Sequence, residues 1–273
     1  MSQIVPINNK SNDATANSIT SAAVNVDVIP GSASGIKKIG YGLLILVAIL
    51  LLWSILVWAQ GSYRVLSDDP TVWQNSIEQL SLQDSTRILD PDKMTTLFVG
   101  SSSIRLFKDM DQVFAQTNTI KKGFGGAKIN DLNFYKESLI YQQNAQLIVI
   151  YIGINDILYR DHEDTDELTQ DLFLLLDDII QKSGHIPIAL VALRPIAKPK
   201  LRQEIADFNF QLSRYAISHP LVYFIDPNDR LLTPSGELNQ QLLHWDGFHL
   251  NDAGYHAWGN AIRDKLTELK LQP

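Results

Sequence analysis

Residues 95–105 read TTLFVGSSSIR, and this stretch decides the fold. Its first five residues, 95–99, are β-branched or apolar, which predicts a short strand buried on both faces. Gly100 then permits a sharp turn, and serines follow where a helix would begin. A doubly buried strand that runs into a helix is typical of a parallel sheet covered by helices.

The same alternation of strand and helix continues to the end of the chain. The other predicted strands are residues 119–122, 147–152, 186–193 and 222–225, and helical patterns lie near residues 128–142, 165–182 and 200–218. A last helix begins near the N-cap Asn251 and has Trp258, Ala261, Ile262, Leu266 and Leu269 on one face. We therefore predict an α/β domain whose five-stranded parallel sheet has right-handed crossovers.

The N-terminal part of the chain is organised differently. Residues 1–38 are rich in Ser, Asn, Ala, Thr and Val without any period, so we expect them to be disordered. Residues 39–60 predict a transmembrane helix, because the 21 residues from Ile39 to Ala59 carry no charge and span a bilayer core of about 30 Å. Residues 61–94 predict a linker with a short packing helix, and 95–273 the α/β domain.

Flanking charges predict how this helix is oriented. Lys37 and Lys38 precede the apolar run, and only Arg64 follows it closely. The positive-inside rule then puts the N-terminus in the cytoplasm and everything after Gln60 outside. We expect a single-pass signal anchor of the cytoplasmic membrane with a periplasmic or extracellular domain. A cleaved signal peptide is the alternative, but no clean A-x-A site follows the run.

Charge and cysteine usage exclude several classes of function. The chain has 23 basic and 30 acidic residues, a formal net charge of −7. An acidic protein repels phosphate backbones, so we expect no nucleic-acid partner. The absence of cysteine excludes disulfides, thiolate metal sites and a cysteine nucleophile.

Chemically capable residues stand where the predicted strands end, which is where parallel sheets bind their ligands. Gly100-Ser101-Ser102-Ser103 follows the first strand, Gly123-Phe124-Gly125-Gly126 the second and Gly153-Ile154-Asn155-Asp156 the third, and Trp245-Asp246-Gly247-Phe248-His249-Leu250 precedes the last helix. Each segment taken alone is explained more simply as a turn or a helix cap. Together they supply a hydroxyl nucleophile, a base, a carboxylate to orient it and donors for an oxyanion. The residue types alone do not choose among the three serines.

These four segments, in this order, resemble the SGNH hydrolases, also called GDSL-type esterases or lipases. The resemblance covers about residues 72–269, and DGFHLNDAGY at 246–255 is its most specific stretch. FVGSSSIR at 98–105 is similar to the first block of a bacterial subgroup, so the chain is identified as a membrane-anchored bacterial member. The resemblance implies a flavodoxin-like, three-layer α/β/α sandwich.

The resemblance also implies the role of each site residue. Ser102 corresponds to the nucleophile, and Asp246 and His249 correspond to the rest of a catalytic triad. The backbone N–H groups of Ser102 and Gly126 and the side-chain amide of Asn155 correspond to oxyanion donors. The family's Gly-Asp-Ser is Gly-Ser-Ser here, at a position outside the catalytic set.

Other residues are weaker candidates. Arg105, His244 and Trp245 are candidates for lining the substrate site, although an outward salt bridge explains Arg105 equally well. The acidic run at 161–167 is better explained as the start of a solvated helix than as a metal site. We expect neither a metal ion nor a cofactor.

The expected activity is hydrolysis of a small acyl ester through an acyl-enzyme. An O-acetyl group on an envelope or extracellular carbohydrate is the first candidate substrate, because the domain is expected to face outward. The alternatives are a lysophospholipase-type activity on lipids, acyl transfer by the same triad, and a non-catalytic envelope module. The sequence identifies no protein partner.

Overall fold

The structure is a computed structural model that describes residues 33–159 and 165–273. The expected disordered segment, 1–38, lies almost entirely outside the described residues. The chain divides into two compact units, residues 1–54 and Ile55–Pro273, and the boundary between them in the sequence falls within the first helix.

The second unit contains the sheet and nearly all of the helices. The strands are β1 (Thr95–Gly100), β2 (Asn118–Gly123), β3 (Leu147–Tyr151), β4 (Ile188–Val191) and β5 (Val222–Ile225). The α-helices are α1 (Ala33–Leu66), α2 (Gln74–Ser85), α3 (Ser102–Leu106), α4 (Met110–Val113), α5 (Ile129–Phe134), α6 (Lys136–Leu139), α7 (Ile154–Tyr159), α8 (Thr165–Ser183), α9 (Arg202–Ser218) and α10 (Asp252–Glu268). Short 3₁₀ segments are η1 (Pro70–Trp73), η2 (Tyr141–Gln143), η3 (Pro199–Leu201), η4 (Asn228–Leu231) and η5 (Gln240–Leu242).

All five strands form one parallel sheet in the order β2-β1-β3-β4-β5. This is the flavodoxin-like order, so the predicted fold class is confirmed. Gly100 at the end of β1 lies beside Gly123 of β2 and Tyr151 of β3, so these three strands end at one rim. The direction of winding reverses between β1 and β3, and the loops after these two strands therefore border a crevice.

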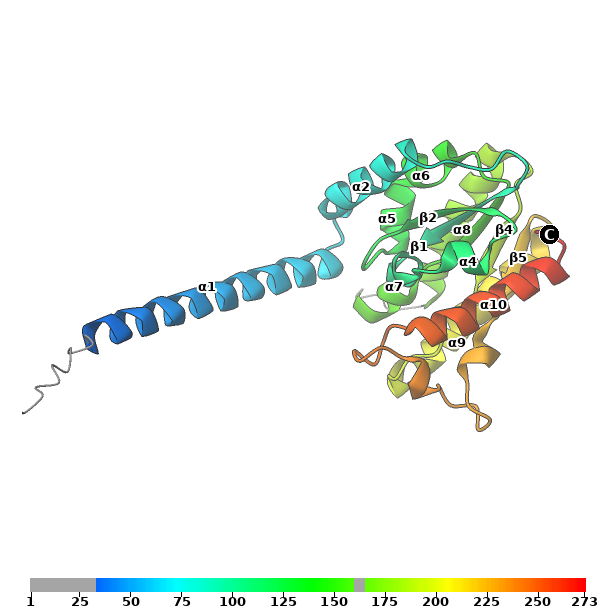
Figure 1. The fold of residues 1–273 in the computed structure, drawn as a ribbon. Coiled ribbons are helices and arrows are strands. Elements are labelled where there is room, and N and C mark those ends of the chain that lie inside the picture. The colour runs from blue at the N-terminus through cyan, green and yellow to red at the C-terminus, as the bar shows by residue number, and fades with distance from the viewer. Residues whose placement is uncertain (1–32, 160–164) are drawn as a thin grey trace, which may run out of the picture. The chain divides into compact units, whose positions relative to one another are not determined.

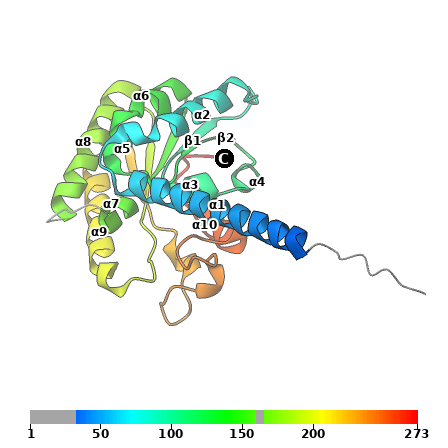
Figure 2. The same ribbon diagram turned by 90° about the vertical axis from the view of Figure 1, so that its left-hand side faces the viewer.

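Helices cover both faces of the sheet (Figures 1 and 2). The view in Figure 2 shows α8 and α9 on one side of β1 and β2, and α4 and α10 on the other. This covering explains the sequence pattern, because every residue of β1, β3 and β4 is buried and both faces of these strands must be apolar. Strand β5 at one edge is only partly buried at Tyr223 and Phe224.

Helix α1 is longer at both ends than the expected span of 39–60. Its part Tyr41–Leu66 is long and apolar enough to cross a membrane, and none of its most apolar window is buried. The segment 61–66 contains Gly61 but no proline, and the helix continues to Leu66 and stops shortly before Pro70. The residues from Ile55 onward belong to the same unit as the sheet.

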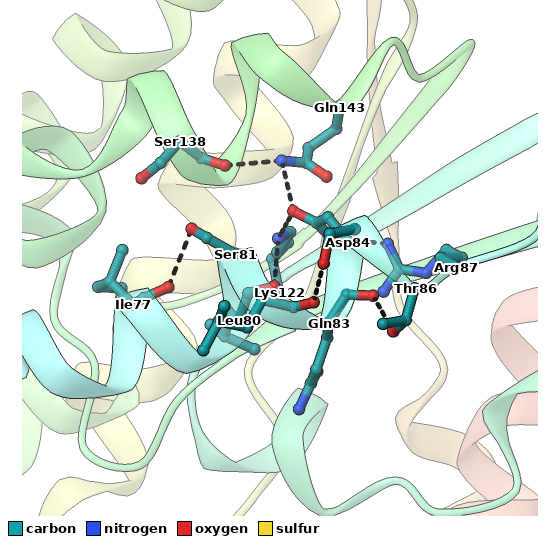
Figure 3. A network of polar contacts seen from close by, with 12 residues as sticks. Ile77, Leu80, Ser81, Gln83, Asp84, Thr86, Arg87, Lys122, Ser138 and Gln143 are labelled. Carbon is teal, nitrogen blue, oxygen red and sulfur yellow. Dashed lines mark hydrogen bonds and ion pairs between the residues drawn. The ribbon is translucent and has the colours of Figure 1, made fainter.

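A polar network attaches α2 to the edge strand β2 (Figure 3). The ammonium of Lys122, which is fully buried, pairs with Asp84 and donates to the Leu80 carbonyl oxygen at 3.1 Å. Asp84 also accepts from Arg87 at 2.9 Å and from Gln143 at 3.4 Å. Burial lowers the pKa of Lys122, and the carboxylate of Asp84 opposes that shift. The predicted packing helix is thus held by a charged side chain under its inner face.

Three predicted elements differ in detail. The pattern near 128–142 forms α5, α6 and η2 instead of one helix, and the break falls at Tyr135, whose hydroxyl donates to Gln74 of α2 at 3.2 Å. Tertiary packing there outweighs local helix propensity. Strand β4 starts later than predicted because Pro187 has no N–H for the ladder. Leu269 follows the last turn of α10 and is exposed.

Candidate active site

The turn after β1 presents Ser102 at the crevice between β1 and β3. Gly100 has φ +153°, and a side chain there would collide with the carbonyl of Tyr151 on β3. The Ser101 N–H donates to that same carbonyl oxygen at 3.3 Å, so the turn is held against the neighbouring strand. Helix α3 then begins at Ser102. The close approach of the two strands therefore requires glycine at position 100 and fixes where the serine lies.

Ser102, His249 and Asp246 form a hydrogen-bonded chain. The distance from Ser102 Oγ to His249 Nε2 is 2.9 Å, and that from His249 Nδ1 to Asp246 Oδ2 is 2.7 Å. The serine and the histidine are 147 positions apart in the sequence. The structure thus brings together the three residues that the sequence predicts as a triad.

The loop before α10 holds the carboxylate of Asp246 in place. Its Oδ1 accepts from the backbone N–H groups of Phe248 and His249, each at 2.9 Å. Burial acts to raise the pKa of Asp246, but the hydrogen bonds from the His249 ring and from the two N–H groups prevail and lower it to about 2. Asp246 is therefore an ionised acceptor at neutral pH, and it fixes which ring nitrogen of His249 carries the proton.

Gly126 and Asn155 lie on the loops after β2 and β3. Gly126 has φ +77°, a left-handed conformation that favours glycine. Asn155 is buried, and one N–H of its amide donates to the Ala127 carbonyl oxygen at 2.9 Å. A carboxamide has two N–H donors, and the second has no partner among residues 33–159 and 165–273, so it can bind a ligand. Asp156 accepts from the Ile129 N–H at 3.2 Å and so joins the two loops.

A hollow of about 340 Å³ surrounds these groups. It is lined by Gly61, Arg64, Val65, Trp73, Ser102, Arg105, Gly125, Gly126, Asn155, Tyr159, Phe248 and His249. Arg105 lines the hollow, and its guanidinium makes no ion pair within residues 33–159 and 165–273. His244 and Trp245 are placed elsewhere: both are exposed, Trp245 at 89 %, because the turn that directs Asp246 and His249 inward points the preceding side chains outward.

Sequence reasoning did not identify Arg194. This arginine follows β4 closely and is 1 % exposed. Its guanidinium donates to the Phe248 carbonyl oxygen and lies over the Phe248 ring at 5.0 Å from the centroid. Phe248 directly precedes His249, so Arg194 supports the loop that carries the imidazole. The signal was available, because Arg194 stands just after a predicted strand like the other site residues.

The end of α1 was also not expected at this site. Gly61, Arg64 and Val65 line the hollow, although the sequence assigns them to a linker. A hydropathy pattern shows that this segment ends an apolar helix, but it carries no information on which loop the helix touches.

Within the described residues no group of His, Asp or Glu could hold a metal ion, and part of the acidic run 161–167 lies outside them.

The fold and the groups at its rim define an ester-bond hydrolase of the α/β class. The chain belongs to the GDSL-like lipase/acylhydrolase family, whose model matches residues 99–257. This match confirms the resemblance seen in the sequence.

Solved structures with the same fold include several esterases. A GDSL-like lipase from Bacteroides thetaiotaomicron is 17% identical, with a TM-score of 0.60 over 71% of this chain and 98% of the other. An acetylxylan esterase from Geobacillus stearothermophilus is 17% identical, with a TM-score of 0.55 over 66% of this chain and 96% of the other. A family 3 carbohydrate esterase from Clostridium thermocellum is 16% identical, with a TM-score of 0.54 over 64% of this chain and 96% of the other. No curated protein sequence matches the chain. At these identities the likeness establishes the fold alone.

Proposed function

We propose that this protein hydrolyses carboxylic esters with Ser102 as nucleophile, His249 as general base and acid, and Asp246 as the group that orients the imidazole. The observation that carries the proposal is the continuous hydrogen-bonded chain, 2.9 Å from serine to histidine and 2.7 Å from histidine to aspartate. The first length is within reach of direct proton transfer, and the second is that of a hydrogen bond that orients the imidazole.

The reaction has two halves. His249 Nε2 takes the Ser102 proton while Oγ attacks the ester carbonyl carbon, and the resulting oxyanion accepts hydrogen bonds from the Ser102 and Gly126 backbone N–H groups and the Asn155 amide. The alcohol leaves with the proton from His249, and the acyl group stays on Ser102. Water then attacks this ester while His249 takes its proton, and His249 returns that proton to Ser102 Oγ as the acid is released.

We further propose that residues 39–60, within α1, anchor the enzyme in a membrane, with the N-terminus in the cytoplasm and the domain outside. The length and apolar character of the helix and the lysines before it support this arrangement. Reporter fusions after Gln60 test the orientation, since activity confined to a cytoplasmic reporter would overturn it.

The substrate expected from the sequence, a short acyl or O-acetyl ester of envelope carbohydrate, remains a prediction. Two of the solved structures with this fold are an acetylxylan esterase and a carbohydrate esterase, which makes acetylated xylan a reasonable first assay. Acyl transfer by the same triad is separated from hydrolysis by product analysis with and without a carbohydrate acceptor.

A serine-directed fluorophosphonate probe and p-nitrophenyl acetate test the mechanism together. The wild-type protein should be labelled and should release nitrophenol, and Ser102→Ala should do neither, because triad members act as a unit. Ser103→Ala is the matched control, because Ser103 adjoins the nucleophile and should leave labelling intact. Labelling that persists in Ser102→Ala would show that another residue is the nucleophile.

A further inference from the structure

The hollow around Ser102 continues along helix α1. A second hollow, of about 450 Å³, is lined by Trp58, Gly61, Ser62, Val65, Leu66 and Tyr159. Three of these residues, Gly61, Val65 and Tyr159, also line the hollow that contains Ser102 and His249. The two hollows therefore adjoin, and we refer to them together as the groove from Ser102 to Trp58.

The far part of this groove is apolar. Trp58 is 73 % exposed and Tyr159 is 41 % exposed, and Val65 and Leu66 complete the same wall. Covering aromatic side chains of this size with an apolar group removes apolar surface from water and so lowers the free energy. The groove therefore has the character of a site for a hydrocarbon chain.

Polar contacts attach the end of α1 to the loop that carries Gly126. Lys128 is buried, and its ammonium donates to the Ser67 carbonyl oxygen at 3.0 Å and to Asp68 Oδ1 at 2.9 Å. Asn130 donates to the Asp68 carbonyl oxygen at 3.2 Å. The residues that directly follow α1 are thus bound to the residues that directly follow the candidate oxyanion loop, so the helix end is a fixed wall of the groove.

The α1 residues that line the groove lie at the end of the proposed membrane-spanning run or directly after it in the sequence. The uncharged run from Ile39 to Ala59 has a helical length of about 31 Å, which matches a hydrocarbon core of about 30 Å. Gly61 and Val65 then lie just beyond the core, and Trp58 lies at its boundary, where tryptophan is enriched. A lipid could reach Ser102 from the bilayer without leaving it completely.

Two arginines give the groove a positive end. Arg64 and Arg105 both line the hollow around Ser102, and neither guanidinium has a hydrogen bond or an ion pair in the part of the chain that the structure describes. The proposed ester site therefore has two side-chain cations on its wall that can bind an anionic group. Arginine binds carboxylate and phosphate oxygens through paired N–H donors.

We propose that the last turns of α1 form part of the substrate site, and that the substrate is a membrane-borne fatty-acyl ester with a negative charge near the ester. Its chain lies along Trp58, Val65 and Tyr159, and Arg64 and Arg105 bind its anionic group. This inference rests on the proposed esterase function and adds the class of substrate. The bond that breaks is the acyl ester, so the products are a fatty acid and the anionic alcohol.

The full-length protein in phospholipid vesicles should hydrolyse 1-oleoyl-lysophosphatidate, and Gly61→Leu should reduce this activity relative to p-nitrophenyl acetate at least tenfold. A Cβ at Gly61 meets no atom within 4 Å, so leucine enters the groove without displacing protein atoms. Gly42→Leu is the matched control, because Gly42 lies on the same helix with equally open space. It should leave the ratio of the two activities at the wild-type value.

The charge on the substrate tests the arginines. Arg64→Gln and Arg105→Gln should each lower the preference for oleoyl-lysophosphatidate over uncharged mono-oleoylglycerol about tenfold, as expected when a charge-assisted hydrogen bond is lost. An equal loss of activity on both lipids would contradict the proposal that these arginines bind an anionic group of the substrate.

Two results would overturn this inference while the esterase function stands. One is an unchanged ratio of lipid to acetate turnover in Gly61→Leu. The other is a lipid that inhibits acetate hydrolysis without being hydrolysed, which would make the groove a lipid contact only. Loss of both acetate turnover and fluorophosphonate labelling in the wild-type protein would instead refute the proposed function.

Discussion

Val65 of α1 lies directly over Gly126, so a residue of the N-terminal helix closes the space beside a candidate oxyanion donor. A Cβ at Gly126 would be 2.7 Å from Val65 Cγ2 and 3.2 Å from the Trp73 ring. The left-handed backbone and the close cover therefore both require glycine at this position.

Gly126→Ala should lower kcat for p-nitrophenyl acetate at least tenfold, because the loop must move away from Val65 and carries its N–H with it. Gly184→Ala is the control, since Gly184 has nearly the same φ, +76°, with open space around its Cβ. Both variants should lose about 1 kcal/mol of stability from backbone strain, and Gly126→Ala should lose more because its Cβ also meets Val65 and Trp73. Only Gly126→Ala should lose activity, and equal activity in the two would contradict the role of the Gly126 N–H.

Asn155→Ala should reduce kcat about 10²–10³-fold with little change in KM, the pattern expected when a donor acts in the transition state. The Ala127 carbonyl also loses its partner, so the apparent Tm should be measured alongside the steady-state kinetics. Asn155→Asp is informative because it keeps the size but replaces the donor by a negative charge. An Asn155→Asp enzyme with normal kcat would exclude the amide from the oxyanion site.

Arg194→Met should lower kcat about tenfold or more, because the Phe248 carbonyl loses its donor and His249 follows in the chain. Arg194 acts as a positioning residue, so its effect should depend on the imidazole. We expect the pH profile of kcat to change shape in Arg194→Met and to recover in part in Arg194→Lys. A fall in stability with an unchanged profile and no rescue would assign Arg194 to packing alone.

The buried Asp131 should make stability depend on pH. Burial raises its pKa to about 6 from 3.8, against the opposing Lys128 N–H and charge. A carboxyl group whose pKa is raised in the folded state binds its proton more tightly there than in the unfolded chain. The stability that this contributes is complete below about pH 4 and is lost as the pH rises through about 6. Asp131→Asn should therefore gain in Tm relative to wild type between pH 4 and 7. A difference in Tm between the two proteins that stays constant over this range would show that Asp131 has an ordinary pKa.

Most of the fold follows from local rules. Strands 95–99 and 147–152 were predictable because doubly buried strands leave uninterrupted apolar runs. The cap at Asn251 was predictable because asparagine is a preferred N-cap residue, and its side chain accepts from the Gly254 N–H. The division of 128–142 was not predictable, because local periodicity does not report contacts with distant segments such as that of Tyr135 with Gln74.

The same distinction applies to the site. Ser102, Asn155, Asp246 and His249 stand at strand ends or before the last helix, so topology alone brings them together. His244 and Trp245 are near Asp246 in the sequence, but nearness in sequence does not determine where a side chain points in a tight turn. Val65 and Lys128 act through contacts across more than 50 residues, and no periodicity or motif carries that information.

The attachment of Ser67 and Asp68 by Lys128 has a practical consequence. A soluble domain obtained by deleting everything before residue 67 would keep the triad but lose Gly61, Arg64 and Val65 from the cleft. Such a truncated enzyme would have a wider, less selective opening and a looser glycine loop. Kinetics and inhibitor screens on the shortened protein would then describe a different specificity from that of the intact chain.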